Sequence, residues 1–169
     1  KSDMSGDIHK FTKLLAEACE RKGVKFFYET EIVKVNHDKK QPILFFNQSN
    51  EIQKQNYDGI VVCAGVNSKF IAKNLGDKIN IYPVKGYSIT ILLDDKESIR
   101  NAPYVSLLDD KAKIVSSRLG KDRFRIAGTA EFNGYNRDIR ADRINPLIKW
   151  CNELFPRVST EHAIPWAGL

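Results

Sequence analysis

The chain has 169 residues, of which 42% are hydrophobic and 28% charged, a composition typical of a globular protein and too apolar for a disordered one. Its net charge is +6, but the basic residues are scattered among acidic ones, so a solvated surface is favoured over a nucleic-acid site. No apolar run approaches the roughly 20 residues that a membrane-spanning helix needs.

The beginning of the chain alternates between helical and strand patterns. Asp7 precedes a stretch with apolar residues at helical spacing, which predicts a capped helix that ends at Gly23. Short strands are then predicted at 24–28, 31–35, 43–46 and 51–55. The last three of these would form an antiparallel meander.

Residues 60–64 are all apolar, and this predicts a strand buried on both faces, as in a parallel sheet. Gly65 follows it, and a glycine at the end of such a strand lets the backbone approach a cofactor. A tight turn into a helix is the commoner reason for a glycine there. Ser68 is expected to cap that helix and Gly76 to end it.

From about residue 79 the pattern changes to that of an antiparallel sheet. Strands are predicted at 87–93, 104–108, 113–117 and 124–128, the last two as a hairpin. A covering helix is predicted to begin near Asn145 and Pro146 and to stop at Pro156.

Cysteines and histidines give no sign of a metal site. Cys19, Cys63 and Cys151 are far apart and lie in apolar patterns, so buried free thiols in a reducing compartment are expected. The three histidines are also isolated, whereas zinc sites need closely spaced ligand pairs.

Two features of the second half could carry a ligand. Tyr87 alternates with Ile89 and Ile91, so its ring could either belong to the core or line a pocket. Arginines crowd the predicted hairpin at Arg118, Arg123 and Arg125. An arginine on a sheet can hold a carboxylate with two parallel hydrogen bonds, although solvated hairpin surface is the commoner case.

Several stretches together resemble the D-amino-acid dehydrogenases of the D-amino-acid oxidase-like family of FAD-dependent oxidoreductases. They include Gly6–Gly23, Ile60–Gly65, Pro83-Val84-Lys85-Gly86-Tyr87-Ser88 and Arg125–Glu131, and they extend the resemblance over essentially the whole chain. The segment around Lys85 is the most specific, since the Ala-Gly turn is shared by many flavoproteins.

The resemblance implies a mixed α/β and α+β fold made of two parts. Residues 1–77 would be an internal piece of a Rossmann-like FAD-binding domain, and residues 78–169 a substrate-binding domain with an antiparallel sheet and a helix. It also implies FAD contacts at Ile32, Ala64 and Gly65. Tyr87 and Arg118 are the candidate substrate residues, and no catalytic residue is assigned.

The implied activity is the FAD-dependent oxidation of D-amino acids to 2-oxo acids and ammonia. Electrons would pass to a respiratory acceptor, which suggests a bacterial cytoplasmic protein associated peripherally with the inner membrane. The sequence contains no Gly-x-Gly-x-x-Gly, and its ends suggest cuts, so we expect an inactive piece of a longer protein that does not hold FAD tightly.

The chain departs from the family's residues at two positions, and two alternative functions stay open. Relatives in the glycine-oxidase branch have a tyrosine near the position of Ile114, which this chain lacks, and the family's arginine after Trp-x-Gly-Leu is not among its residues. The parent could instead be another amine, glycine or sarcosine oxidase-like flavoenzyme. The other alternative is a non-enzymatic α/β binding module.

Overall fold

The computed structural model describes residues 5–37 and 41–169 and divides the chain into two compact units. Unit 1 comprises the residues up to Ala16 together with Pro83–Leu169, and unit 2 comprises Glu17–Tyr82. The expected division was at residue 77, with the first residues assigned to the other half. An ion pair between Asp7 and Arg123 joins the first residues to the sheet of unit 1.

Helix α1 (Ile8–Glu20) begins in unit 1 and ends in unit 2, and both of its predicted ends are confirmed. The Asp7 carboxylate accepts hydrogen bonds from the backbone N–H groups of His9 and Lys10, at 3.1 and 3.2 Å. These are two of the donors that a helix start leaves without an internal partner. Gly23 has a φ of 90°, the left-handed conformation in which helices commonly end.

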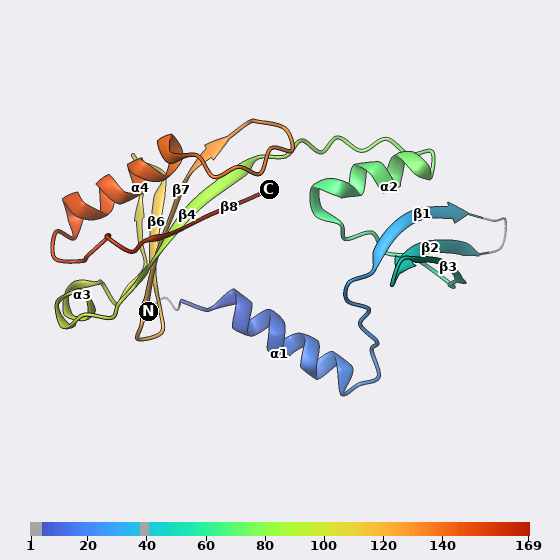
Figure 1. The fold of residues 1–169 in the computed structure, drawn as a ribbon, viewed down its shortest axis with the longest axis horizontal. Helices are drawn as coiled ribbons and strands as arrows, with labels where there is room; N and C mark the ends of the chain where they lie inside the picture. Colours follow the sequence, from blue (N-terminus) through green and yellow to red (C-terminus); the bar gives the residue numbers. More distant parts are fainter. Residues whose placement is uncertain (1–4, 38–40) are drawn as a thin grey trace. The chain divides into compact units, whose positions relative to one another are not determined.

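The predicted meander is confirmed in unit 2. Its strands are β1 (Glu31–His37), β2 (Pro42–Gln48) and β3 (Glu51–Asn56), which pair in that order and antiparallel (Figure 1). Ser49 and Asn50 join β2 to β3 with positive φ angles of 54° and 65°. Two left-handed residues in a row match the right-handed twist of a hairpin, which is why the turn is so short.

Two of the predicted strands of unit 2 are wrong. Residues 24–28 and 60–64 are irregular and largely exposed, and Val61 has 87% of its surface accessible. A buried parallel strand needs neighbours that accept and donate its backbone hydrogen bonds. Among the described residues, no strand pairs with either segment.

A single 3₁₀ turn, Gly65–Asn67, leads into helix α2 (Ser68–Asn74). Ser68 is the first residue of this helix and Asn67 occupies the cap position, so the prediction that Ser68 caps it is wrong. The Ser68 hydroxyl accepts a hydrogen bond from the backbone N–H of Ala64 at 3.1 Å. Gly76 follows α2 with a φ of 88°, as expected for a glycine that ends a helix.

Unit 1 is built on a five-stranded antiparallel sheet in the order β5-β6-β7-β4-β8 (Figure 1). The strands are β4 (Lys85–Leu92), β5 (Leu107–Asp109), β6 (Ile114–Leu119), β7 (Arg123–Glu131) and β8 (Ile164–Gly168). The predicted hairpin is confirmed as β6 and β7. Strand β8 was not predicted, and it pairs with β4, which lies far from it in the sequence.

Two helices complete unit 1. The short α3 (Lys96–Asn101) was not predicted, although Asp95 caps it by accepting from the Ser98 N–H at 2.8 Å. Helix α4 (Ala141–Leu154) begins earlier than predicted, so Pro146 lies inside it and not in its first turn. Proline carries no N–H to donate, so one internal hydrogen bond of α4 is missing at this position.

Helix α4 covers one face of the unit 1 sheet and closes the core. Ile89 of β4, Phe124 of β7 and Leu147 of α4 are completely buried there. Trp150 and Phe155 add edge-to-face aromatic contacts, with Phe155 5.6 Å from the Phe124 ring and 5.7 Å from that of Trp150. The opposite face of the sheet is therefore the one that α4 leaves open.

Candidate functional site

The open face of the unit 1 sheet carries polar side chains on its central strands. In the antiparallel register Arg125 of β7 lies opposite Thr90 of β4 and Ser117 of β6. Directly opposed residues point to the same face, so these three side chains share one surface. Ser88, two residues before Thr90, lies on that face as well.

A pocket of about 410 Å³ lies on this face, entirely within unit 1. It is lined by residues 5–9, which precede or begin α1, by side chains of the sheet, and by Ser106 of the connection between α3 and β5. The sheet residues are Thr90, Ser117, Leu119, Arg123 and Arg125.

Charges in this pocket are unevenly matched. Arg123 donates to Asp7 at 2.6 Å, and this hydrogen bond, followed by that from the Lys10 N–H, lowers the pKa of the Asp7 carboxyl. Arg125 donates to the Ser88 hydroxyl at 3.1 Å, and its guanidinium lies 5.4 Å from the centre of the Trp166 ring. The lining thus holds two guanidiniums and a single carboxylate, so it favours an anionic ligand.

A second polar group is buried at the end of the sheet, around the ion pair of Lys85 and Glu131. The ammonium of Lys85 is 3.1 Å from Glu131 Oε2, and the two residues are 1% and 6% exposed. Tyr87 donates its hydroxyl proton to the same carboxylate. Arg140 and Asn133 donate to the other oxygen at 2.9 and 3.1 Å.

These partners fix the charge of Glu131. The hydrogen bond from Tyr87, then the interactions with Lys85 and Arg140, lower the pKa of Glu131 to about 2 although burial acts in the opposite direction. Burial and the neighbouring carboxylate raise the pKa of the Tyr87 hydroxyl. Glu131 is therefore an anion and Tyr87 a neutral donor at physiological pH.

Lys85 also holds the segment that follows β7. Its ammonium donates to the Asn136 side-chain oxygen at 3.1 Å and to the Asp138 carbonyl at 2.9 Å. One buried lysine thereby connects the start of β4, the end of β7 and the connection to α4. Such fully paired charges impose one geometry on the chain, and the group is a fixed structural centre.

The predicted substrate residues lie in the buried part of unit 1. Tyr87 shares a face with Ile89 and Ile91, as its spacing predicted, but this is the face that α4 covers, and Tyr87 is 2% exposed. Its hydroxyl is occupied by Glu131. These contacts favour the interpretation of Tyr87 as a core residue, and a contact with substrate stays a prediction.

Arg118 lies on the same covered face and is 7% exposed. Its Nη1 donates to the carbonyls of Ile99 and Ala102, both at 2.9 Å, and its Nη2 donates to the carbonyl of Lys121 at 3.1 Å. The guanidinium also stacks 4.3 Å from the centre of the Tyr104 ring. Arg118 thus ties α3 to the β6–β7 turn, which favours a structural role over a carboxylate contact.

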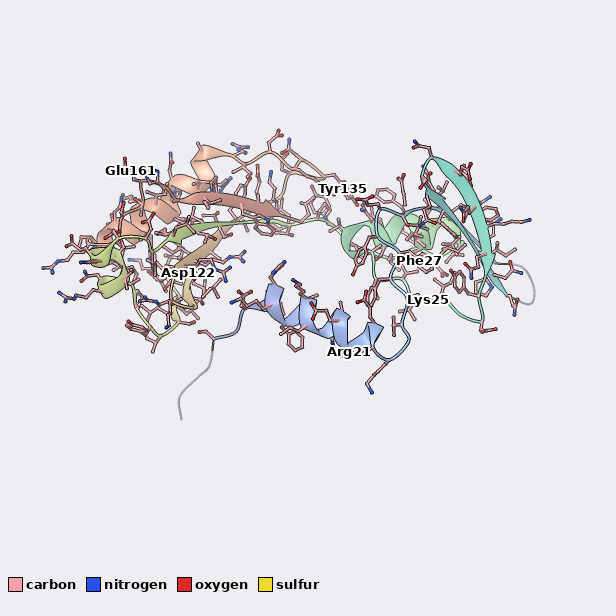
Figure 2. All side chains as sticks on the ribbon, turned by 60° about the horizontal axis from the view of Figure 1, so that its bottom comes forward. Arg21, Lys25, Phe27, Asp122, Tyr135 and Glu161 are labelled. Carbon is pink, nitrogen blue, oxygen red and sulfur yellow. The ribbon has the colours of Figure 1, made fainter. Side chains whose placement is uncertain are left out.

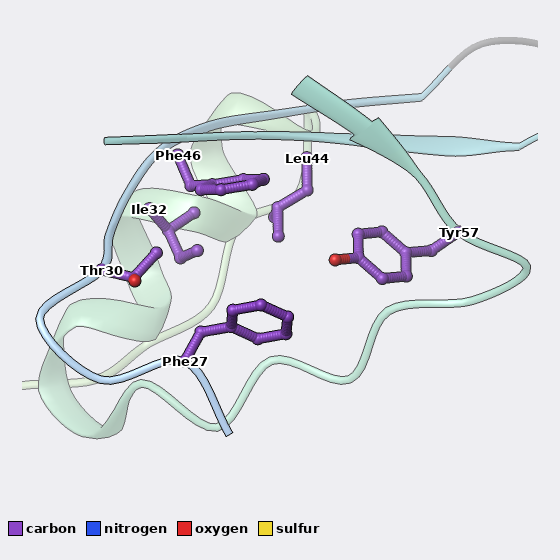
Figure 3. A pocket seen from close by; sticks show the side chains of 6 residues that line it. All are labelled: Phe27, Thr30, Ile32, Leu44, Phe46 and Tyr57. Carbon is purple, nitrogen blue, oxygen red and sulfur yellow. The ribbon is translucent and has the colours of Figure 1, made fainter. Parts of the chain in front are cut away.

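The candidate cofactor residues lie in unit 2. Ile32 of β1 lines an apolar pocket of about 270 Å³ with Phe27, Thr30, Leu44, Phe46 and Tyr57 (Figure 3). In the close-up the rings of Phe27 and Phe46 and the side chain of Ile32 point into the same space, and the Tyr57 hydroxyl points toward it. Polar groups are few, so this pocket suits a flat apolar ring system.

Ala64 and Gly65, the other two candidates, form the exposed turn before α2. Gly65 has a φ of 52°, and no other group lies within 4 Å of the position that a Cβ would take. The backbone is therefore accessible to a ligand from that side. The structure leaves Ala64 and Gly65 outside the pocket that Ile32 lines.

The three cysteines were expected to be buried free thiols. Cys151 is buried, but Cys63 is exposed because it belongs to the irregular segment at 60–64, so the expectation of three buried thiols is wrong. In the described part of the chain, no cluster of histidine, cysteine and acidic residues could hold a metal ion. None of the described helices is both long and apolar enough to cross a membrane. Side chains that end in oxygen and side chains that end in nitrogen occur along both units (Figure 2).

Sequence reasoning recognised the arginine-rich hairpin but selected Arg118, and it missed the pairing of Lys85 with Glu131. Alternation along β7 could have separated Arg125 from Phe124 and Ile126, which are buried. No sequence signal indicates that Glu131 meets Lys85, because that contact depends on the register between β4 and β7.

Comparisons with known proteins bear on both units. A family model described as FAD dependent oxidoreductase matches residues 2–169. Over 168 residues the chain is 53% identical to "D-amino acid dehydrogenase 3" of Mesorhizobium japonicum, and over 172 residues it is 39% identical to a D-amino acid dehydrogenase of Dechloromonas aromatica. These alignments cover 99% and 100% of the chain but 40% of each relative, so the chain spans about 40% of the length of the curated relatives it matches.

Solved structures show the same fold at low sequence identity. A glycine oxidase from Geobacillus kaustophilus has a TM-score of 0.74 with 18% identity, over 91% of this chain and 39% of that one. An L-proline dehydrogenase from P. horikoshii has a TM-score of 0.78 with 15% identity, over 96% of this chain and 43% of that one. The mixed α/β architecture with antiparallel sheets is therefore a fold that this chain shares with these two proteins.

Proposed function

Because the chain belongs to the FAD dependent oxidoreductase family, we propose that the protein containing it oxidises D-amino acids with FAD as its cofactor. The observation that carries the proposal is the 53% identity, over 99% of this chain, to a relative named D-amino acid dehydrogenase 3. Oxidation of the amino acid would give an imino acid. Water would then hydrolyse this imino acid to a 2-oxo acid and ammonia.

The residues of unit 2 fit part of an FAD molecule. The pocket at Ile32 presents aromatic and aliphatic side chains, which suit the adenine ring by stacking and apolar contact. The accessible backbone at Gly65 suits close approach of the dinucleotide. We propose that Ile32, Ala64 and Gly65 contact FAD and that unit 2 is a piece of a Rossmann-like FAD-binding domain.

Unit 1 would be the substrate-binding domain. FAD would supply the hydride acceptor for the amino acid, and the residues of this chain would orient the substrate and exclude water. The open face of the sheet, with Arg125 at its centre and Trp166 beside it, offers the polar and aromatic groups for this. The buried pair of Lys85 and Glu131 would hold that sheet in one shape.

The electron acceptor is proposed from the names of the relatives. Those with 53% and 39% identity are named dehydrogenases, which supports transfer to a respiratory acceptor instead of direct reaction with oxygen. A cytoplasmic protein bound peripherally to the inner face of the bacterial membrane would fit such an acceptor.

The test is an assay of the complete protein that contains this chain, reconstituted with FAD. We expect D-alanine and other D-amino acids to reduce a dye acceptor such as dichlorophenolindophenol, with formation of the matching 2-oxo acid and ammonia. L-Alanine serves as the stereochemical control. Oxidation of neither D-alanine nor any other D-amino acid would refute the proposal.

A related amine oxidation is the second candidate, because the fold is shared with glycine oxidase and L-proline dehydrogenase. Glycine, sarcosine and L-proline should therefore be assayed beside D-alanine. A higher kcat/KM for any of these three would assign the protein to that second group. A protein that binds no flavin at all would point to the non-enzymatic binding module.

A further inference from the structure

We infer that Arg125 binds the carboxylate group of the amino-acid substrate on the open face of the unit 1 sheet. The inference rests on the proposed function and adds to it a specificity-determining residue. Arg125 lies on β7, the central strand of the five, with β6 on one side and β4 on the other.

Partners distinguish Arg125 from Arg118 and Arg123, the other arginines on the sheet strands, and from Arg140. Arg123 pairs with Asp7, Arg140 with Glu131 and Asp142, and Arg118 with three backbone carbonyls. Arg125 has no carboxylate within ion-pair distance among the described residues, and its recorded hydrogen bond goes to Ser88. Its charge is therefore available to a ligand.

The donors around Arg125 suit a carboxylate. A guanidinium has five N–H groups in a planar fork, and the bond to Ser88 uses one of them. Thr90 and Ser117 face Arg125 from the two neighbouring strands and carry hydroxyls on the same surface. Arginine binds a carboxylate through two parallel hydrogen bonds, and a flanking hydroxyl can add a third.

Neighbouring groups orient the guanidinium. The Trp166 ring of β8 stacks against it, with the ring centre 5.4 Å from Cζ. The ring in turn lies over Gly168, where a Cβ would overlap it. Ser88 fixes the other end of the fork at 3.1 Å. A cation held by an aromatic face and a hydroxyl loses little freedom when it binds a ligand.

A merely structural role is the competing explanation, in which Arg125 stabilises the position of β8 through its contact with Trp166. The two roles differ in what a variant loses. Loss of that stabilising contact would lower thermal stability and leave ligand affinity unchanged. Loss of a carboxylate contact would weaken charged ligands and spare neutral ones of the same shape.

The experiment compares Arg125→Met, Arg125→Lys and a control, Arg100→Met, in the complete protein reconstituted with FAD. Arg100 lies at the exposed end of α3 and makes the same substitution available in the same unit. We expect Arg125→Met to lower kcat/KM for D-alanine by about tenfold to a hundredfold, mainly through KM, with partial recovery in Arg125→Lys. Arg100→Met should match the unmodified protein.

Binding is measured separately by calorimetry, with propionate and its neutral analogue propionamide as probes. Propionate should lose affinity in Arg125→Met by a similar factor, and propionamide should not. Unchanged propionate affinity, or equal losses for both probes, would overturn the inference, as would a lowered Tm with unchanged KM. If the protein oxidises no D-amino acid, the proposed function fails, and the propionate measurement still decides whether Arg125 binds a carboxylate.

Discussion

Leu147 of α4 provides the most direct test of where the core of unit 1 lies. It is fully buried between the helix and the sheet, whereas Leu154, in the last turn of the same helix, is 53% exposed. The substitutions Leu147→Ala and Leu154→Ala remove the same atoms from the same helix. Any difference between them therefore reports burial and not helix propensity.

The expected loss of unfolding free energy follows from the number of buried carbon groups that are removed. At about 0.8 kcal/mol for each buried carbon group, truncation beyond Cβ costs about 2.4 kcal/mol in transfer free energy. The cavity left in a rigid core adds to this, so Leu147→Ala should lower the free energy of unfolding by about 3 kcal/mol, within a range of about 2–5. Leu154→Ala should change it by about 0.5 kcal/mol or less.

Urea unfolding followed by tryptophan fluorescence is the appropriate assay. Trp150 belongs to the same core cluster as Leu147, so its emission reports the loss of that cluster. With an m-value of about 2 kcal/mol/M, the midpoint for Leu147→Ala should fall by about 1.5 M. Equal shifts for the two variants, or a shift below about 0.5 M for Leu147→Ala, would refute the placement of the core under α4.

Three further outcomes are expected from the purified chain. Because the folded pKa of Glu131 is about 2 and its ordinary value is 4.5, its stabilising effect is complete above pH 4.5 and is lost as the pH falls through about 2. Glu131→Gln should thus lower the urea midpoint at pH 7 but converge with the unmodified chain near pH 2, and a constant difference across this range would contradict the ionised pair. Burial raises the pKa of Cys151 to about 12, so iodoacetamide at pH 8 should alkylate the exposed Cys63 first, as peptide mass mapping would show; equal rates in the native chain would mean that Cys151 is accessible. The chain should be colourless after purification, because its sequence has no glycine-rich phosphate loop, and one bound flavin per chain by absorbance would show that unit 2 suffices for FAD.

Local signals in the sequence were sufficient for several elements. Asp7 and Gly23 mark the ends of α1 because capping depends on neighbours within one turn. The meander and the β6–β7 hairpin were predictable because their partners are adjacent in the sequence. The alternation of Tyr87, Ile89 and Ile91 on one face was also readable from the period of a strand.

Elements that depend on distant contacts were missed or misplaced. Strand β8 contains Pro165, which disfavours a strand, and it is held in place by β4. The apolar residues 60–64 have the pattern of a buried strand, but pattern alone cannot supply neighbouring strands. In the same way, alternation placed Tyr87 with Ile89 and Ile91 on one face of their strand without showing which face a helix covers.

The order in which the elements of unit 1 occur along the chain has a consequence for folding. Unit 2 interrupts unit 1 between Ala16 and Pro83. The strands of unit 2 therefore leave the ribosome before β4, the first strand of unit 1. Strand β4 must then wait for β7 on one side and for β8, which ends at Gly168, on the other. Pairings between such distant segments form slowly, because the entropy cost of closing a long loop comes before the stabilising contacts form. During synthesis β4 therefore remains without its partner strands until β7 and β8 have been made, and unpaired strand edges of this kind favour aggregation.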